Sequence, residues 1–326
     1  MPDLSPAVRK AAPAGWLTRV RPFIGVIALV VLCIVFGLRE PRFLSAANLF
    51  HVLNTMAIVG ILAIGQAFPL IGGGFDLSQG AVASLTGAVT ASLMSQYGVP
   101  MTVAIPAGLT LGLLLGLVNG LLVARVGINP FVATLGTQIA FFGLTNVYAD
   151  NQPIGIGPSA ETFRQLSFGT LGPFTWASLL FLVLVALLAF VLRMLPFGQH
   201  VYTLGGNEEA SRLAGLNTAR IKIATYVLSS LFATIGGFVI IARAGQASPA
   251  AGTGYELQSL ASCIVGGIAL GGGLGSAWNV LLGVLTLGVV EVGLQMAVNA
   301  PNWRPVIQGG IILLAVAVDA RARLRR

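Results

Sequence analysis

The chain has 326 residues, of which 56% are hydrophobic and only 9% are charged, whereas soluble domains carry about 25% charged residues. Its formal net charge is +8, but the basic residues lie between apolar runs and form no basic face of the kind that binds nucleic acid. The composition therefore excludes a water-soluble globule and predicts an integral membrane protein.

Ten apolar segments of the sequence are candidate membrane-spanning helices, since about 20 apolar residues are needed to cross the hydrocarbon core as a helix. Two of them are rich in glycine, 77–96 and 256–270, and the second is short, so either is a candidate for a broken or re-entrant helix. The ten segments lie near 23–38, 49–71, 77–96, 102–124, 130–149, 175–195, 221–242, 256–270, 276–297 and 304–319.

The predicted organisation is a single all-α transmembrane domain over residues 23–319. A cytoplasmic N-terminal segment, 1–22, precedes it and a basic cytoplasmic tail, 320–326, follows it. The apolar run after Arg21 has no convincing signal-peptide cleavage site, so we expect it to remain as a helix. The tail reads RARLRR, which fits a cytoplasmic anchor; a patch for acidic lipid or nucleic acid is the alternative.

The distribution of basic residues indicates the orientation, because Lys and Arg collect in short cytoplasmic loops. With ten alternating spans and both termini inside, 13 of the 18 basic residues lie on the cytoplasmic side. Removing one of the middle spans would spoil this bias, so the charges favour an even number of spans. The basic residues left outside are Arg39, Arg42, Arg164, Arg243 and Arg304.

An internal repeat is visible at an offset of 180 residues. Between residues 65 and 89, nine positions are identical to the residue 180 further on, where roughly two would match by chance in such a composition. GQAFPLIGGGFDLSQGA at 65–81 aligns with GQASPAAGTGYELQSLA at 245–261. The copies begin five spans apart and so enter the membrane in opposite directions, which predicts an inverted repeat of spans 2–5 and 7–10.

Inverted repeats of this kind place the solute path near the membrane midplane, at helices interrupted by Gly and Pro. The stretches 65–74 and 245–254 fit this description, although close helix packing or a tight turn also explains their glycines. Asp76 and Glu256 lie at span ends in the two copies, where each either caps a helix, the first of them beginning at Leu77, or lines the path. Glu291 lies inside the ninth segment and is a further functional candidate.

Several function classes find no support in the sequence. No Walker motif is present, because neither Lys10 nor Lys222 follows a glycine, so ATP energy would have to come from another subunit. Cys33, Cys263, His51 and His200 are isolated and predict neither a metal site, a disulfide nor a catalytic centre. We therefore expect no enzyme activity, no cofactor and no metal in this chain, and proton coupling is disfavoured because a chain of titrating residues is missing.

The longest cytoplasmic loop, 196–219, carries the signature of a short helix. Gly205 and Gly206 break the chain, Asn207 is placed to cap, and Gly215 closes a helix that ends near Ala214. On this pattern alone the segment is either a docking element for a partner or an ordinary solvated connector.

The order and spacing of several motifs resemble the permeases of bacterial ABC importers of the ribose, galactose and xylose type. The resemblance covers nearly the whole chain after about residue 40. The sequence departs from the usual family pattern at Gly74-Phe75 and at Gln79. The motifs are FLSAANLFHVL at 43–53, GGGFDLSQGAVASLTGAV at 72–89, GINPFVATLGT at 127–137, LGGNEEASRLAGLN at 204–217, AGTGYELQSLASCIVGGIALGGGLGS at 251–276 and GGIILLAVAVD at 309–319.

The resemblance implies a permease in the bacterial inner membrane that pairs with a second copy or a paralogue. It also implies two cytoplasmic ATPase subunits, which hold the ATP and Mg²⁺, and a periplasmic binding protein that delivers the solute. The loop 196–219 would contain the coupling helix that enters a cleft on the ATPase. Its residues would be Gly205, Gly206, Asn207, Glu208, Glu209, Ala210, Arg212, Leu213 and Gly215.

The expected solute is a pentose, a hexose or a polyol. Another small polar solute, such as a nucleoside or a branched-chain amino acid, is the alternative within the same machinery, and a stand-alone secondary transporter is an alternative outside it. A sugar path would be lined by amides, hydroxyls and aromatic faces. The candidate path residues are therefore Gln66, Phe75, Asp76, Gln246, Tyr255 and Glu256.

Overall fold

The computed structural model describes residues 24–157 and 160–298, together with the single positions 303, 306, 309, 310 and 313. The predicted N-terminal segment 1–22 and the basic tail 320–326 lie outside the described residues, as does most of the predicted span 304–319. The count of ten spans therefore stays a prediction.

The described part is almost entirely helical, with four strands of two residues each. β1 pairs antiparallel with β4, and β2 with β3. In chain order the elements are α2 (Ile24–Arg39), the 3-10 turn η2 (Pro41–Leu44), α3 (Ala46–Ile71), α4 (Gln79–Ser95), α5 (Met101–Leu121), the π turn η3 (Leu122–Val126), α6 (Pro130–Tyr148), β1 (Ile154–Gly155), α7 (Ala160–Phe168), β2 (Thr170–Leu171), β3 (Phe174–Thr175), α8 (Trp176–Met194), α9 (Pro196–Gly206), α10 (Glu208–Leu213), α11 (Thr218–Ala244), β4 (Gln246–Ala247), α12 (Tyr255–Val265) and α13 (Ala277–Val298).

A helix lies at each of the first nine predicted segments. By length and composition, five helices of the described part are able to cross a membrane: α3, α5 with η3, α8, α11 and α13. α2 is apolar but shorter. The structure thus confirms an all-α membrane protein.

The eighth predicted segment is a broken helix. α12 has 11 residues, and at about 1.5 Å per residue it reaches only about half of the hydrocarbon core. The chain then continues without helix from Gly266 to Ser276. Gly267, with a φ of +102°, turns the backbone away from the helix. The third segment, α4, is continuous over 17 residues and almost all of it is buried inside the bundle.

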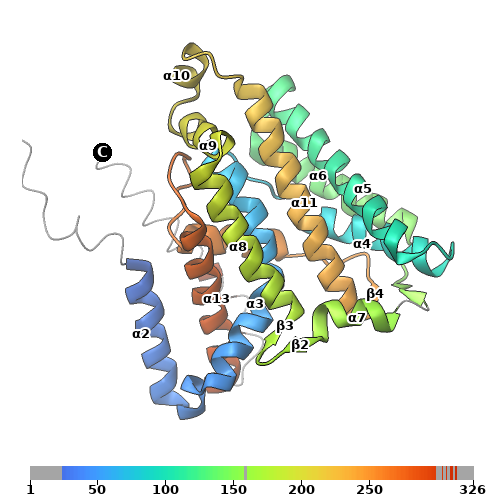
Figure 1. The fold of residues 1–326 in the computed structure, drawn as a ribbon, viewed down its shortest axis with the longest axis vertical. Helices are drawn as coiled ribbons and strands as arrows, with labels where there is room; N and C mark the ends of the chain where they lie inside the picture. Colours follow the sequence, from blue (N-terminus) through green and yellow to red (C-terminus); the bar gives the residue numbers. More distant parts are fainter. Residues whose placement is uncertain are drawn as a thin grey trace, which may run out of the picture.

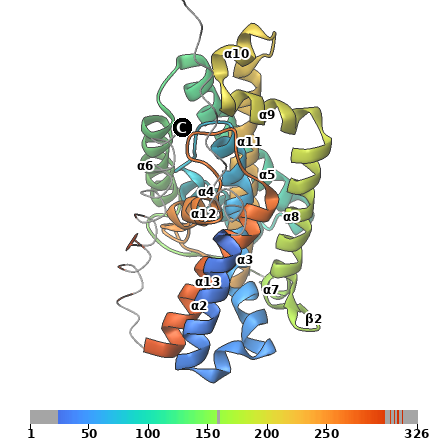
Figure 2. The same cartoon turned by 90° about the vertical axis from the view of Figure 1, so that its left-hand side faces the viewer.

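The helices form a bundle with one end marked by α10 and the other by the short strands (Figure 1). α3 runs from the strand end to the α10 end, whereas α11 runs the opposite way, as expected for an inverted repeat (Figure 1). The two helices pack against each other, and α4 packs on α11. Figure 2 shows α4 and α12 beside each other near mid-height of the bundle.

Glycines at every fourth position of α5 allow it to lie close to α11. A Cβ placed at Gly116 would lie 2.7 Å from the Tyr226 carbonyl oxygen and 2.8 Å from the Val227 Cα. In a bilayer, small residues bring helices together because van der Waals contact drives their association. This contact fixes α11 between α3, α4 and α5. The glycines of the stripe are Gly108, Gly112, Gly116 and Gly120.

Candidate functional site

The centre of the bundle contains a carboxylate, Asp76, in the segment between α3 and α4, and its side chain is completely buried. One carboxylate oxygen accepts hydrogen bonds from the backbone N–H of Ser78, at 2.9 Å, and from its hydroxyl, at 2.6 Å. The other accepts from the Ser229 hydroxyl of α11 at 2.8 Å. The N-cap of α4 is Ser78, without a side-chain capping bond, so Asp76 does not cap the helix; it holds the residue that precedes α4 and joins it to α11.

The first residue of α4 differs from the prediction: the helix begins at Gln79 and not at Leu77. The Asp76 side chain bonds the Ser78 N–H, and Leu77 and Ser78 form a turn instead of the first helical residues.

Hydrogen bonds extend from Asp76 to two further helices. Asn119 of α5 donates to the Ser78 hydroxyl at 2.7 Å, and Thr137 of α6 donates to the Asn119 carbonyl oxygen at 2.7 Å. Buried polar groups are tolerated in a bundle interior where donors and acceptors are matched, as they are around Asp76. We call the connected set of Asp76, Ser78, Gln79, Asn119, Thr137, Ser229 and Ser259 the buried polar network.

Gln79 connects the two copies of the repeat. Its side-chain nitrogen donates to the Ser229 hydroxyl at 3.0 Å and to the Leu62 carbonyl at 3.1 Å. Its side-chain oxygen accepts from the Ser259 hydroxyl at 2.7 Å. Residues 79 and 259 are equivalent in the 180-residue repeat, so the two copies meet at the network.

The backbones of the two copies also touch. A Cβ at Gly252 would overlap the Gly80 carbonyl oxygen, and the Gly252 N–H donates to the Ser84 hydroxyl of α4 at 2.9 Å. The segment before α12 therefore reaches the first turns of α4. Close packing was the alternative explanation for the glycines of 245–254, and this contact supports it for Gly252.

Glu256 lies in the first turn of α12 and is 5% exposed. One carboxylate oxygen accepts from the Gln138 side chain of α6 at 2.8 Å and from the Gly254 N–H at 3.2 Å. The other oxygen, within the described residues, has no hydrogen-bond partner. Glu256 therefore supports its helix start, as Asp76 does, and keeps one acceptor available beside α4.

The remaining predicted path residues lie in three different environments. Gln66 is fully buried in α3, and within the described part of the chain its amide makes no hydrogen bond. Phe75 and Tyr255 are half-buried, and the Phe75 ring faces Phe131 of α6 edge-on at 6.3 Å between centroids. Gln246 is exposed on β4, where it pairs with Gly155. The structure thus places Asp76 inside the network, leaves the Glu256 carboxylate bonded to Gln138 outside it, and leaves Gln246 at the strand end.

Sequence reasoning missed most members of the network. Asn119, Thr137, Ser229 and Ser259 are polar residues inside apolar spans, alone or beside one other polar residue. Their position within an apolar span could have identified them as candidates, since burying a polar group at membrane depth costs free energy unless the group is paired or functional.

At the α10 end of the bundle, α9 and α10 form a hairpin-like projection (Figure 1). The Asn207 side chain caps α10 by accepting from the Ala210 N–H at 2.9 Å, and Gly215 follows with φ of +85°. The predicted short helix is therefore confirmed. Gly205 and Gly206, however, belong to the last turn of α9, a helix that the sequence reading did not predict.

α9 is packed tightly onto the ends of both repeat copies. A Cβ at Gly205 would overlap the Ile71 carbonyl oxygen at the end of α3, and Gly273 donates its N–H to that same oxygen at 2.8 Å. Tyr202 donates its hydroxyl to the Gly275 carbonyl at 2.7 Å. Burial raises the pKa of Tyr202, so the hydroxyl keeps the proton that it donates.

The outer face of α10 is strongly exposed. Leu213 is 80% exposed, and the side chains of Glu209 and Arg212, paired at 3.7 Å, are 76% and 70% exposed. Ala210 and Gly215 are exposed as well. An exposed leucine between charged residues on a projecting helix is a surface suited to a protein partner.

The described residues contain no group of three or more His, Cys, Asp or Glu able to hold a metal ion. The geometry described above combines a buried polar centre around Asp76, where the two inverted copies meet, with a projecting helix at one end.

Comparison with known proteins agrees with this geometry. Residues 48–316 match the family model described as the branched-chain amino acid transport system / permease component. The ribose import permease protein RbsC of Escherichia coli K12 is 36% identical over 314 residues, which cover 95% of this chain and 96% of that protein.

Other relatives give the same result. RbsC of Bacillus subtilis is 35% identical and covers 94% of both chains. The fructose import permease protein FrcC of Rhizobium meliloti is 35% identical over 90% of this chain and 84% of that protein. No solved structure matches the chain. Because the family model matches well over half of the sequence and the ribose permeases align along nearly its full length, the chain belongs to this family of membrane permease components.

Proposed function

We propose that the chain is the membrane-spanning permease subunit of an ATP-driven bacterial importer, and that its solute is a pentose, a hexose or a polyol. The observation that carries this proposal is the full-length similarity to import permeases for ribose and fructose. The structure supports it, because the buried centre offers amides and hydroxyls, which suit a neutral polyhydroxylated solute.

The proposal assigns the chain's partners by the same similarity. They are a second permease copy or paralogue, two cytoplasmic ATPase subunits that hold ATP and Mg²⁺, and a periplasmic solute-binding protein. Both termini and the segment from Gly205 to Gly215 lie on the cytoplasmic side, and α10 is the coupling helix. Gln66, Phe75, Asp76, Gln246, Tyr255 and Glu256 remain the proposed path residues. The chain itself contributes no catalysis and spans the inner membrane with ten helices within 23–319.

The test is to purify the tagged permease in a mild detergent and identify the co-purifying proteins by mass spectrometry. We expect an ABC ATPase and a binding protein. Replacing Glu209, Arg212 and Leu213 together by alanine should remove the ATPase, since these side chains form the exposed face of α10.

The matched control lies at the other end of the bundle. Glu161 and Arg164 of α7 have the same spacing and are exposed, so replacing both by alanine should leave the ATPase bound. A folded permease that binds no ATPase and takes up solute alone would reject the importer in favour of a secondary transporter.

A second candidate solute follows from the family description, which names branched-chain amino acid transport. In that case the co-purified binding protein would bind leucine or a related amino acid and not ribose, fructose or galactose. Calorimetric titration of the binding protein with these compounds separates the two candidates.

A further inference from the structure

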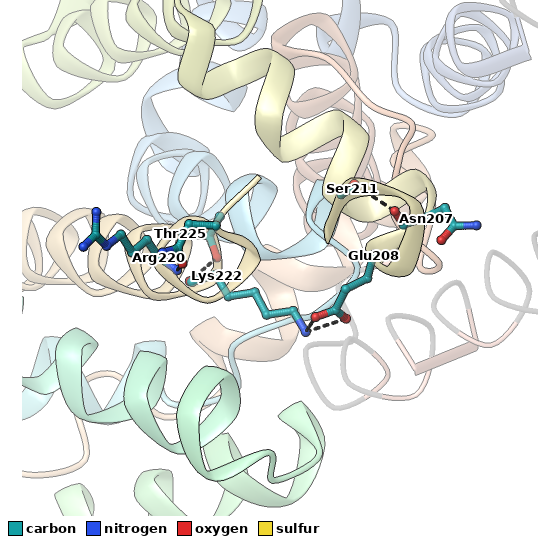
Figure 3. Close-up of polar contacts among 7 residues, drawn as sticks. Asn207, Glu208, Ser211, Arg220, Lys222 and Thr225 are labelled. Atoms are coloured by element: carbon teal, nitrogen blue, oxygen red, sulfur yellow. Dashed lines mark hydrogen bonds and ion pairs between the residues drawn. The ribbon is translucent and has the colours of Figure 1, made fainter. Parts of the chain in front are cut away.

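An ion pair attaches α10 to the core of the bundle. Glu208, the first residue of α10, meets Lys222 in the first turns of α11 at 2.7 Å between Lys222 Nζ and a carboxylate oxygen. Their side chains are 51% and 24% exposed. Figure 3 shows the two side chains reaching toward each other across the gap between α10 and α11.

Lys222 shares one face of α11 with two residues that hold the Asp76 segment. Tyr226 and Ser229 lie four and seven residues after Lys222, and this spacing places all three on one side of a helix. The Tyr226 hydroxyl donates to the Phe75 carbonyl at 3.3 Å, and the Ser229 hydroxyl donates to Asp76 at 2.8 Å. A continuous helix of about 10 Å therefore separates the ion pair from the buried polar network.

α10 consequently has two different faces. Glu209 and Arg212 pair with each other in the solvent. Glu208 pairs with α11, and Ser211, three residues later, is 4% exposed and donates to the Asn207 carbonyl. A partner bound to the outer face can move α10 while the inner face stays attached to α11.

We propose that the Glu208–Lys222 ion pair passes a displacement of α10 to the Asp76 segment through α11, and so couples the ATPase to the solute path. The proposal rests on the proposed function, in which α10 docks on an ATPase. Glu208 and Lys222 are positioning residues, because neither of them touches the network.

Charge reversal tests the pair. The variants are E208K, K222E and the double swap E208K/K222E, each purified as the complex with its co-purifying ATPase and binding protein and placed in proteoliposomes. The readout is the amount of labelled ribose, fructose or galactose imported per ATP hydrolysed. Each single reversal should lower this ratio by about fivefold or more, which is the low end of typical coupling energies. The double swap should restore most of it.

The controls separate coupling from docking and folding. All three variants should retain the ATPase in a pull-down and elute as the wild-type complex in size exclusion. The double reversal E161K/R164E on α7 should leave the ratio unchanged. Failure of the wild-type complex to import any of the three sugars would count against the proposed solute class and not against the pair.

The ion-pair proposal is overturned by any of three results in a wild-type complex that transports. The single reversals could leave the ratio unchanged, the double swap could be no better than the single reversals, or a single reversal could release the ATPase, which would make the reversed residue part of the docking surface.

Discussion

At the scale of single residues, Asp76 is the side chain on which the buried polar network depends. It accepts three hydrogen bonds, two from Ser78 and one from Ser229. Asp76→Ala leaves these donors buried without an acceptor, and each such donor costs about 1–3 kcal/mol. We expect Asp76→Ala to lower stability by at least about 2 kcal/mol, seen as a reduced thermal midpoint of the detergent-purified protein.

Asp76→Asn is the graded variant, since its amide keeps the shape and one acceptor oxygen. We expect a loss of about 1 kcal/mol, because only one donor then lacks its acceptor. Glu161→Ala, at an exposed site on α7, should have no measurable effect. A thermal midpoint for Asp76→Ala equal to that of the wild type would show that the network is not a stabilising unit.

The sequence predicted part of this site. The repeat singled out Asp76 and Glu256 because an aromatic residue precedes a carboxylate in both copies. In the structure Gln79 and Ser259 link Asp76 to the first turn of α12, while the Glu256 carboxylate itself bonds Gln138. Asn119 and Ser229 could not be placed, since one or two polar residues in an apolar run do not reveal which helix they face. Gln246 aligns with Gln66, but it is the exposed residue of a two-residue strand, while Gln66 is buried in a helix.

At the scale of elements, alanine substitution should have opposite effects on stability at Gly116 of the α5 glycine stripe and at Gly136 of α6. At Gly116 even alanine would meet the α11 backbone at 2.7 Å, and overpacking of this kind costs about 1–3 kcal/mol. Gly136 of α6 has open space around its Cβ position, and alanine favours a helix over glycine by about 1 kcal/mol.

We therefore expect Gly116→Ala to lower the thermal midpoint and Gly136→Ala to leave it equal or raise it. Both variants add one methyl group to a helix, so a difference in sign isolates the α5–α11 contact. Equal effects of the two substitutions would mean that this contact relaxes without cost.

Helix positions were predicted well where apolar runs are long, as for α3 and α11, because the bilayer sets the length of a span. α9 was missed, since its sequence PFGQHVYTLGG contains three glycines that usually mark a break. Gly205 is explained by the close contact with Ile71, and buried Val201 and Leu204 hold the helix in place. Such tertiary contacts override local propensity and leave no periodic signal in the sequence.

At the scale of the whole molecule, the orientation of the bundle depends on residues at its two ends. Among the basic residues of the described part, Arg193 and Arg212 lie in the last turns of α8 and α10, Arg220 and Lys222 in the first turns of α11, and Arg125 in η3, whereas Arg39 ends α2, Arg42 lies in η2, Arg164 in α7 and Arg243 in the last turn of α11. Figure 1 shows α10 and the start of α11 at one end of the bundle and α7 and the end of α11 at the other. The bias between the two ends is small by itself. Most of the predicted cytoplasmic excess of basic residues comes from 1–22 and 320–326, which the predicted topology places on the α10 side.

Cysteine labelling tests this orientation in the intact membrane. Leu213 on α10 is 80% exposed and Leu171 on β2 is 60% exposed, and they lie at opposite ends of the bundle (Figure 1). With Cys33 and Cys263 replaced by alanine, Leu213→Cys should react with a membrane-impermeant maleimide only in inside-out vesicles. Leu171→Cys should react only in right-side-out spheroplasts.

The reverse labelling pattern would place α10 outside the cell, where no ATP-driven subunit could reach it, and the importer proposal would fail together with the coupling role of Glu208 and Lys222. With α10 in the cytoplasm, a force on its exposed face reaches α11 at Lys222, passes along a helix held by the α5 glycines, and arrives at the Asp76 segment where the two inverted copies meet.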